Sequence, residues 1–246
     1  MLIGRRGLSR FVSFAPAMLA SFPASPADRI TVVATFSVIG DMLANVAGDH
    51  VDIKTIVAAG SDCELYQPTP ADVATLARAR AVFFNGLNDE FEPWLEPLLK
   101  QAAFKGAKVV VTRGVRTLTA EDEHPVSGTL VPSAIDQHAW LDPRNGVIYV
   151  RGIAEALVRL DPANAADYRT RASAYTKQIQ AIDNWARNEM ASVPVARRRV
   201  LVSHDSLRYI ASAYGITLLT VNGWPTKANR RRRNSRNRRD RSSRSG

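Results

Sequence analysis

Apolar and polar positions along the first half of the chain alternate between two periods. Near-continuous apolar runs recur, and between them apolar residues stand three to four positions apart, which predicts strands alternating with helices. Apolar strands separated by helices predict a parallel sheet with helices on both faces, the α/β class. Such sheets bind ligands at the carboxyl ends of their strands. The predicted strands are 30–34, 51–57, 81–86 and 107–114; the predicted helices are 38–46, one that opens at Pro70, 91–104 and one that ends near Leu160.

The second half of the chain begins with an unusually long helical pattern. From 162 to 191, apolar residues recur at three- to four-residue spacing, which corresponds to about 43 Å of helix at 1.5 Å per residue. A helix of this length can act as a strut between two lobes or pack along one lobe. The pattern then reads strand (199–203), helix (206–213) and strand (217–221), which indicates the start of a second α/β lobe.

The first 27 residues have the pattern of a signal peptide. Arg5 and Arg6 supply a positive region, an apolar stretch of signal-peptide length follows, and small residues precede a predicted cleavage after Ala27. The arginine pair also fits a twin-arginine export signal as an alternative to the general route. Because no cysteine lies at the cleavage site and no other apolar run reaches membrane length, we expect a soluble, exported protein without a lipid anchor.

The net charge of +10 is concentrated at one end. The last 20 residues hold ten of the 33 basic residues and one of the 23 acidic ones, so the rest of the chain is almost neutral and does not have the charge of a nucleic-acid-binding protein. We expect the basic tail, 224–246, to be disordered, since it has almost no apolar residue to bury. It fits a polyanion-binding arm or a solvated tail. The abrupt change in composition favours a third interpretation, a change of reading frame that replaced the rest of the second lobe.

Candidate metal ligands gather at predicted strand ends. The loop "GSDCELYQPTP" follows the strand 51–57 and contains Asp62, Cys63 and Glu64. Since Cys63 is the only cysteine, an internal disulfide and a cysteine-based zinc cluster are excluded. His138 lies in "DQHAWLDP" beside a carboxylate, and His204 lies where the strand 199–203 meets the next helix.

These residue types suit a divalent cation. Imidazole nitrogens from His138 and His204 would suit zinc, whereas the oxygen of Glu64 shifts the preference toward manganese. Asp62, Cys63 and His124 are further candidates; His124 lies in an acidic loop and could capture a cation transiently. The sequence lacks the motifs of zinc proteases, serine hydrolases and nucleotide-binding proteins. A zinc-dependent hydrolase stays open as an alternative, with Asp62 or Asp205 as the base.

Four segments together resemble one family. They are "VVATFSVIGDMLANVAGD", "YQPTPADVATLARARAVFFNGL", "DQHAWLDPRNGVIYVRGIAEAL" and "VLVSHDSLRYIASAYGI". They closely resemble the zinc- and manganese-binding solute-binding proteins of bacterial ABC transporters, from about Ile30 to Gly223. The resemblance implies two parallel-sheet lobes joined by one long rigid helix, with the metal held between the lobes. It also implies a periplasmic receptor, not an enzyme, that delivers the ion to a membrane permease.

The resemblance places the family's second and third ligands on His138 and His204, and puts Glu64 where the family has its first histidine. The family's fourth ligand, an aspartate, has no counterpart, because the tail occupies that stretch. We therefore expect weak metal binding, or binding through the first lobe alone; a defective remnant is the alternative function. We expect a monomer without a specific nucleic-acid partner. The implied domains are the signal peptide 1–27, a first lobe 28–161, a linking helix 162–192, a partial second lobe 193–223 and the tail 224–246.

Overall fold

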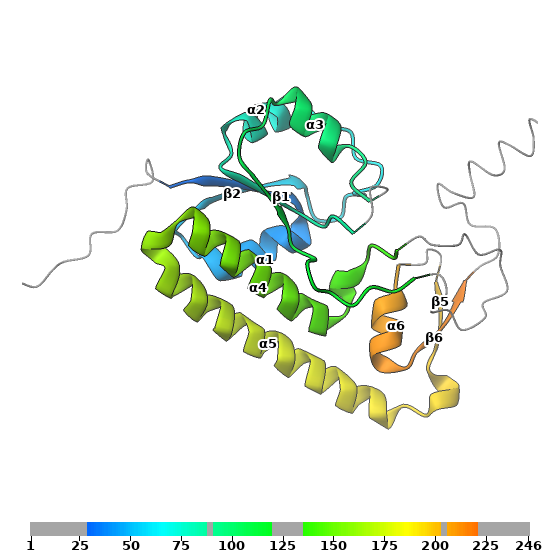
Figure 1. The fold of residues 1–246 in the computed structure, drawn as a ribbon. Coiled ribbons are helices and arrows are strands. Elements are labelled where there is room, and N and C mark those ends of the chain that lie inside the picture. The colour runs from blue at the N-terminus through cyan, green and yellow to red at the C-terminus, as the bar shows by residue number, and fades with distance from the viewer. Residues whose placement is uncertain (1–28, 88–90, 120–134, 203–205, 221–246) are drawn as a thin grey trace, which may run out of the picture.

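The computed structural model describes residues 29–87, 91–119, 135–202 and 206–220. Strands and helices alternate as the apolar pattern predicts, and both sheets are parallel (Figure 1). The predicted α/β class and the long helix are therefore confirmed. The strands are β1 (Thr31–Phe36), β2 (Asp52–Val57), β3 (Ala81–Phe84), β4 (Ala107–Val110), β5 (Arg199–Val202) and β6 (Thr217–Thr220). The helices are α1 (Ser37–Ala47), α2 (Pro70–Arg78), α3 (Leu95–Gln101), α4 (Pro143–Leu160), α5 (Ala165–Ser192) and α6 (Arg208–Tyr214), with 3-10 turns η3 (Ala139–Leu141), η4 (Pro162–Asn164) and η5 (Val195–Arg197).

The first sheet has the strand order β2-β1-β3-β4. The chain therefore runs from β1 outward to β2 and then crosses back over β1 to β3. This reversal makes the carboxyl ends of β1 and β3 the topological switch point, where open α/β sheets form a crevice for ligands.

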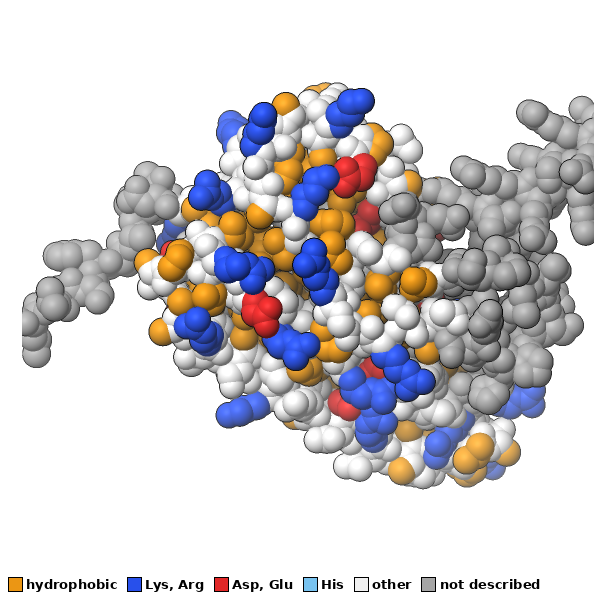
Figure 2. All heavy atoms as spheres, viewed as in Figure 1, with side chains coloured by type: hydrophobic (Ala, Val, Ile, Leu, Met, Phe, Trp, Pro, Cys, Tyr) orange, Lys and Arg blue, Asp and Glu red, His pale blue; other side chains and the backbone are white. Residues whose placement is uncertain are grey.

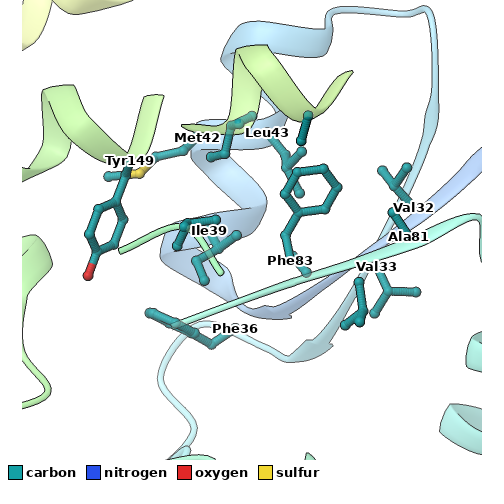
Figure 3. Close-up of a cluster of buried hydrophobic side chains, with 14 of the residues drawn as sticks. Val32, Val33, Phe36, Ile39, Met42, Leu43, Ala81, Phe83 and Tyr149 are labelled. Atoms are coloured by element: carbon teal, nitrogen blue, oxygen red, sulfur yellow. The ribbon is translucent and has the colours of Figure 1, made fainter. Parts of the chain in front are cut away.

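Helices cover both faces of this sheet. In Figure 1, α2 and α3 lie on one face, and α1, α4 and α5 lie on the other. The register places Ala34 beside Phe83, and in Figure 3 the Phe83 ring points toward Ile39 and Leu43 of α1. A Cβ on Gly40 would lie 2.5 Å from Thr55 Oγ1, so the glycine allows α1 to approach β2 closely. Burial on both faces explains why the strand sequences are apolar throughout instead of alternating.

The long helix α5 has 28 residues and packs antiparallel along α4 over its first half. Tyr168 and Ala172 are its buried residues, and both belong to the first half. The second half extends to the parallel pair β5–β6, whose two strands α6 connects (Figure 1). The helix thus joins the two sheets, as expected of a strut, and also packs along the first lobe.

Several predicted features lie outside the described residues. These are the signal peptide 1–27, His124, His204, Asp205 and the basic tail 224–246. Among the helices that the structure does describe, none is long and apolar enough to span a membrane.

Candidate metal centre

The loop after β2 is held in one conformation by Asp62. Its Oδ1 accepts the backbone N–H of Glu64 at 2.8 Å and that of Leu65 at 3.1 Å. On the other side of the loop, the Trp94 indole donates a hydrogen bond of 2.8 Å to the carbonyl oxygen of Cys63. Both anchors flank Glu64, so the backbone that carries this carboxylate is defined before any metal binds.

The end of the same loop is closed by a capping box. The Thr69 hydroxyl accepts the backbone N–H of Asp72, and the Asp72 carboxylate accepts that of Thr69 at 2.7 Å. The Tyr66 hydroxyl donates to the same carboxylate at 2.9 Å. Pro70 occupies the first turn of α2, as the sequence predicts, because its missing N–H costs nothing there. The helix start therefore fixes the loop from its carboxyl side.

His138 is oriented by Asp136. Asp136 Oδ1 lies 2.7 Å from His138 Nδ1 and also accepts the His138 backbone N–H at 2.9 Å. His138 is 8% exposed. A carboxylate on one imidazole nitrogen is the usual support of a metal-binding histidine, since it sets the tautomer and the ring direction. With Nδ1 committed to Asp136, Nε2 is the nitrogen that would bind a metal.

Aromatic rings surround this histidine. The His138 ring lies 5.4 Å from the Trp140 ring and 6.2 Å from the Phe91 ring. Phe36, the last residue of β1, packs against both of these rings. His138 therefore lies at the switch point of the sheet, in surroundings of low polarity that strengthen electrostatic attraction to a cation.

The two candidate ligand loops are in direct contact. Gln137 Nε2 donates a hydrogen bond of 2.8 Å to Glu64 Oε1, and Gln137 is the neighbour of His138. The structure thus brings together the two loops that carry Glu64 and His138, which lie far apart in the sequence.

The helix α6 holds the His138 loop from the second lobe. The Tyr209 hydroxyl donates to the Asp136 carbonyl at 3.0 Å and accepts the Leu118 N–H at 2.9 Å. Arg208 donates to the Thr119 carbonyl at 2.7 Å, and its Nη1 lies 3.8 Å from Asp136 Oδ2. Asp136 Oδ2 is buried, and no described residue donates a hydrogen bond to it. The position of the ligand loop therefore depends on both lobes.

A buried polar network lies next to the site. Asn85, directly after β3, donates to the Gln137 carbonyl at 2.8 Å and accepts from the Tyr149 hydroxyl at 2.8 Å. The Glu92 carboxylate accepts the backbone N–H groups of Asn85 and Gly86. Burial raises the pKa of Glu92 to about 7, although these N–H groups and the Thr35 hydroxyl partly offset the shift. Glu92 therefore has a pKa near neutral, and its carboxylate is bonded to the backbone that follows β3.

The structure gives the remaining candidates different roles. Cys63 belongs to the hydrophobic core, and burial, reinforced by the Glu92, Asp62 and Glu64 charges, raises the pKa of its thiol far above the usual value. Since metals bind the thiolate, this position disfavours Cys63 as a ligand. Asp62 Oδ1 shapes the loop, while His124 and His204 lie outside the described residues. Within the described ranges, no group of three or more histidine, cysteine, aspartate or glutamate side chains is arranged to hold a metal.

The sequence alone does not reveal the residues that hold the candidate ligands in position. The carboxylate beside His138 in "DQHAWLDP" is visible in the sequence, but its bond to Nδ1 is not. The contacts of Gln137 with Glu64, and of Tyr209 with Asp136, join segments 73 residues apart in each case. No local pattern marks such pairs, because they form only when the sheet is assembled.

Two parallel α/β sheets joined by one long helix, with polar candidate ligands at the carboxyl edge of the first, define a two-lobed binding protein. Within this class, the chain belongs to the family described as zinc-uptake complex component A, periplasmic (ZnuA), which matches residues 32–238.

Relatives of the chain are named for different metals. The chain is 34% identical over 206 residues to the iron-binding protein YfeA of Yersinia pestis, covering 84% of this chain and 63% of YfeA. It is 31% identical to the manganese ABC transporter substrate-binding lipoprotein PsaA of Streptococcus pneumoniae, covering 78% of this chain and 61% of PsaA. The manganese-bound periplasmic metal binding protein of Candidatus Liberibacter asiaticus superimposes with a TM-score of 0.69 at 29% identity, covering 81% of this chain and 71% of that one. The chain thus spans less than two thirds of the length of YfeA and PsaA.

Proposed function

We propose that this protein is an extracytoplasmic receptor for a divalent metal ion, which it delivers to the membrane permease of an ABC importer. The observation that carries the proposal is the arrangement of His138. Its Nδ1 is held by Asp136, its neighbour Gln137 holds Glu64, and the ring lies at the switch point of the sheet. Family membership supports the same function, and named relatives include metal-binding substrate-binding proteins of ABC transporters.

We assign three ligands, His138 Nε2, a Glu64 oxygen and His204. Two nitrogens and an oxygen fit zinc, which accepts histidine and carboxylate ligands. The carboxylate of Glu64 in place of an imidazole moves the preference toward harder ions such as manganese. We propose zinc as the cargo, with manganese as the alternative. A catalytic role is not part of the proposal.

The proposed organisation follows from the elements. The first lobe (28–161) carries Glu64 and His138, the linking helix (162–192) contains α5, and the second lobe (193–223) carries His204. Residues 1–27 act as the signal peptide and lead to a periplasmic location; relatives named as periplasmic proteins or lipoproteins are consistent with this. The protein functions as a monomer and does not need the tail 224–246 or a nucleic acid to bind the ion.

Metal titration of the purified protein tests the proposal. We expect calorimetry to show saturable binding of Zn²⁺ or Mn²⁺ at one site, with a dissociation constant in the micromolar range or above. His138→Ala removes a ligand, so it should abolish this binding. Glu64→His should strengthen zinc relative to manganese, because it replaces an oxygen ligand with a nitrogen.

His50→Ala is the matched control. His50 bonds Asp167 at 2.8 Å and packs edge-on against Tyr168, away from the Glu64 loop, so its loss should leave metal affinity unchanged. Equal loss in His50→Ala and His138→Ala would assign the effect to folding and refute the ligand role of His138. Absence of saturable binding in the native chain would instead support a remnant that no longer transports metal.

A further inference from the structure

A groove lies between α4 and α5, away from the candidate metal centre. Its volume is about 560 Å³, which is within the range of small-molecule sites. Its floor contains Val150, Ala154 and Ala172, all buried. The two alanines keep the floor low, because larger side chains here would fill the space between the helices. The surface area that lines the groove is mainly apolar.

Three arginines border this apolar floor. Arg151 and Arg159 belong to α4 and Arg169 belongs to α5, and all three are exposed; Glu155 is the one acidic residue of the lining. Figure 2 shows this face of the molecule, where basic side chains surround hydrophobic surface over α4 and α5. Among the residues that the structure describes, the arginines in salt bridges are Arg144, Arg171, Arg187 and Arg208, and none of these lines the groove.

Arginines border the groove toward both of its ends. The two helices are antiparallel and joined by the short segment 161–164, so the last turn of α4 faces the first turns of α5. Arg159 and Arg169 therefore lie toward the same end of the groove, with Glu155 one turn before Arg159 on α4. At the other end Arg151 lies one turn after Val147 on α4, and Thr176 of α5 is uncharged.

We propose that this groove binds a single-chain anionic amphiphile. Its phosphate or carboxylate head would meet Arg159 and Arg169, and its alkyl chain would lie over Ala154 and Ala172 toward Val147. From Val147 to Val158 the groove follows eleven residue steps of α4, roughly 16 Å, about the length of a twelve-carbon chain. A guanidinium pairs with a phosphate or carboxylate through two hydrogen bonds, and the apolar floor gains from covering the chain. This site does not depend on the proposed metal function.

Calorimetric titration with dodecyl phosphate, below its micelle concentration, tests the proposal on the full chain. We expect saturable binding of one molecule, no measurable binding of inorganic phosphate, and much weaker binding of the uncharged 1-dodecylglycerol. The double variant Arg159→Ser/Arg169→Ser should weaken dodecyl phosphate binding at least about tenfold, since it removes two charge-assisted hydrogen-bonding groups. Arg78→Ser, at an exposed arginine of α2, is the matched control and should bind as the native chain does.

A second variant tests the apolar part. Ser173 is exposed at the border of the groove, so Ser173→Trp can cover the floor without disturbing the core, and it should also weaken binding. Circular dichroism and metal titration verify that each variant folds. Unchanged affinity in both variants, or phosphate binding as tight as dodecyl phosphate binding, would overturn the proposal. The proposal would also be overturned if free dodecyl phosphate does not bind while the chain sediments with phosphatidylglycerol vesicles or binds an acidic amphipathic peptide.

Discussion

At the scale of single residues, the candidate metal centre depends on groups that hold the ligands as much as on the ligands. Asp136 supports the His138 ring and its backbone with one oxygen, and Gln137 links the same loop to Glu64. Such supporting residues limit the directions in which a ligand atom can point. Their loss therefore lowers affinity although they need not touch the metal.

Replacing Asp136 tests this support. Asp136→Ala should weaken metal binding by roughly 10- to 100-fold, because the His138 ring loses the acceptor that sets its tautomer. Asp136→Asn keeps a carbonyl oxygen that can accept from Nδ1, so it should retain more of the affinity. Metal titration together with imidazole ¹⁵N shifts checks both variants. Equal affinity in native and Asp136→Ala proteins would show that His138 does not need this carboxylate.

Glu92 should make stability depend on pH. Burial raises its pKa from 4.5 to about 7, so between these values the folded chain holds a proton that the unfolded chain has released. Stability therefore falls as pH rises from about 4.5 to 7, by about 3 kcal/mol, and then levels. Glu92→Gln removes this titration, so it should make the chain more stable at pH 8 than the native chain and nearly equal at pH 4.5.

Chemical denaturation at a series of pH values measures this effect. The difference between native and Glu92→Gln free energies of unfolding isolates Glu92 from the other titrating groups. A constant difference across the range from pH 4.5 to 8 would contradict the raised pKa.

At the scale of secondary structure, α6 connects the second lobe to the His138 loop. The Tyr209 hydroxyl bonds the backbone at Leu118 and at Asp136, so one side chain holds both segments. The element itself is short, seven residues, and most of its contribution comes from such contacts and not from helix propensity. Its role in the site is therefore positional.

Tyr209→Phe removes these two hydrogen bonds and leaves the ring. Because the Leu118 N–H and the Asp136 carbonyl lose a partner, we expect a destabilisation of about 1–3 kcal/mol and a severalfold weaker affinity for metal. Tyr214→Phe is the control, since that hydroxyl bonds Asp183 of α5 and not the ligand loop. It should lower stability while sparing metal affinity. If both variants bind metal equally well, α6 does not position His138.

At the scale of the whole molecule, the two lobes differ in how well they are covered. The first sheet lies between two layers of helices, and its core residues are almost fully buried. Of the large apolar side chains that the structure describes as exposed, most lie in the second half of α5, in η5 or in β5. They are Ile182, Trp185, Val195, Val200 and Leu201.

This exposed surface should govern self-association. We expect a monomer in dilute solution and association through this end as concentration rises, because burying exposed apolar side chains in a contact is favourable. Trp185 is 63% exposed and Leu201 is 66% exposed, so Trp185→Lys/Leu201→Lys should change the free energy of unfolding little while reducing association. Sedimentation velocity over a range of concentrations compares the two proteins. If the sedimentation coefficients of the two proteins depend on concentration in the same way, the self-association contact does not involve these residues.

The order of elements, the parallel sheets and the long helix can be predicted from the sequence, because apolar periodicity and turn residues such as Pro70 act over a few positions. It also indicates Glu64, which lies in the loop after a predicted strand, and His138, which lies beside a carboxylate in "DQHAWLDP". The meeting of Glu64 with Gln137, the bonds of Tyr209 and the near-neutral pKa of Glu92 were decided only by the tertiary structure. Each of these features depends on burial or on the packing of distant segments, and local residue spacing encodes neither burial nor long-range packing.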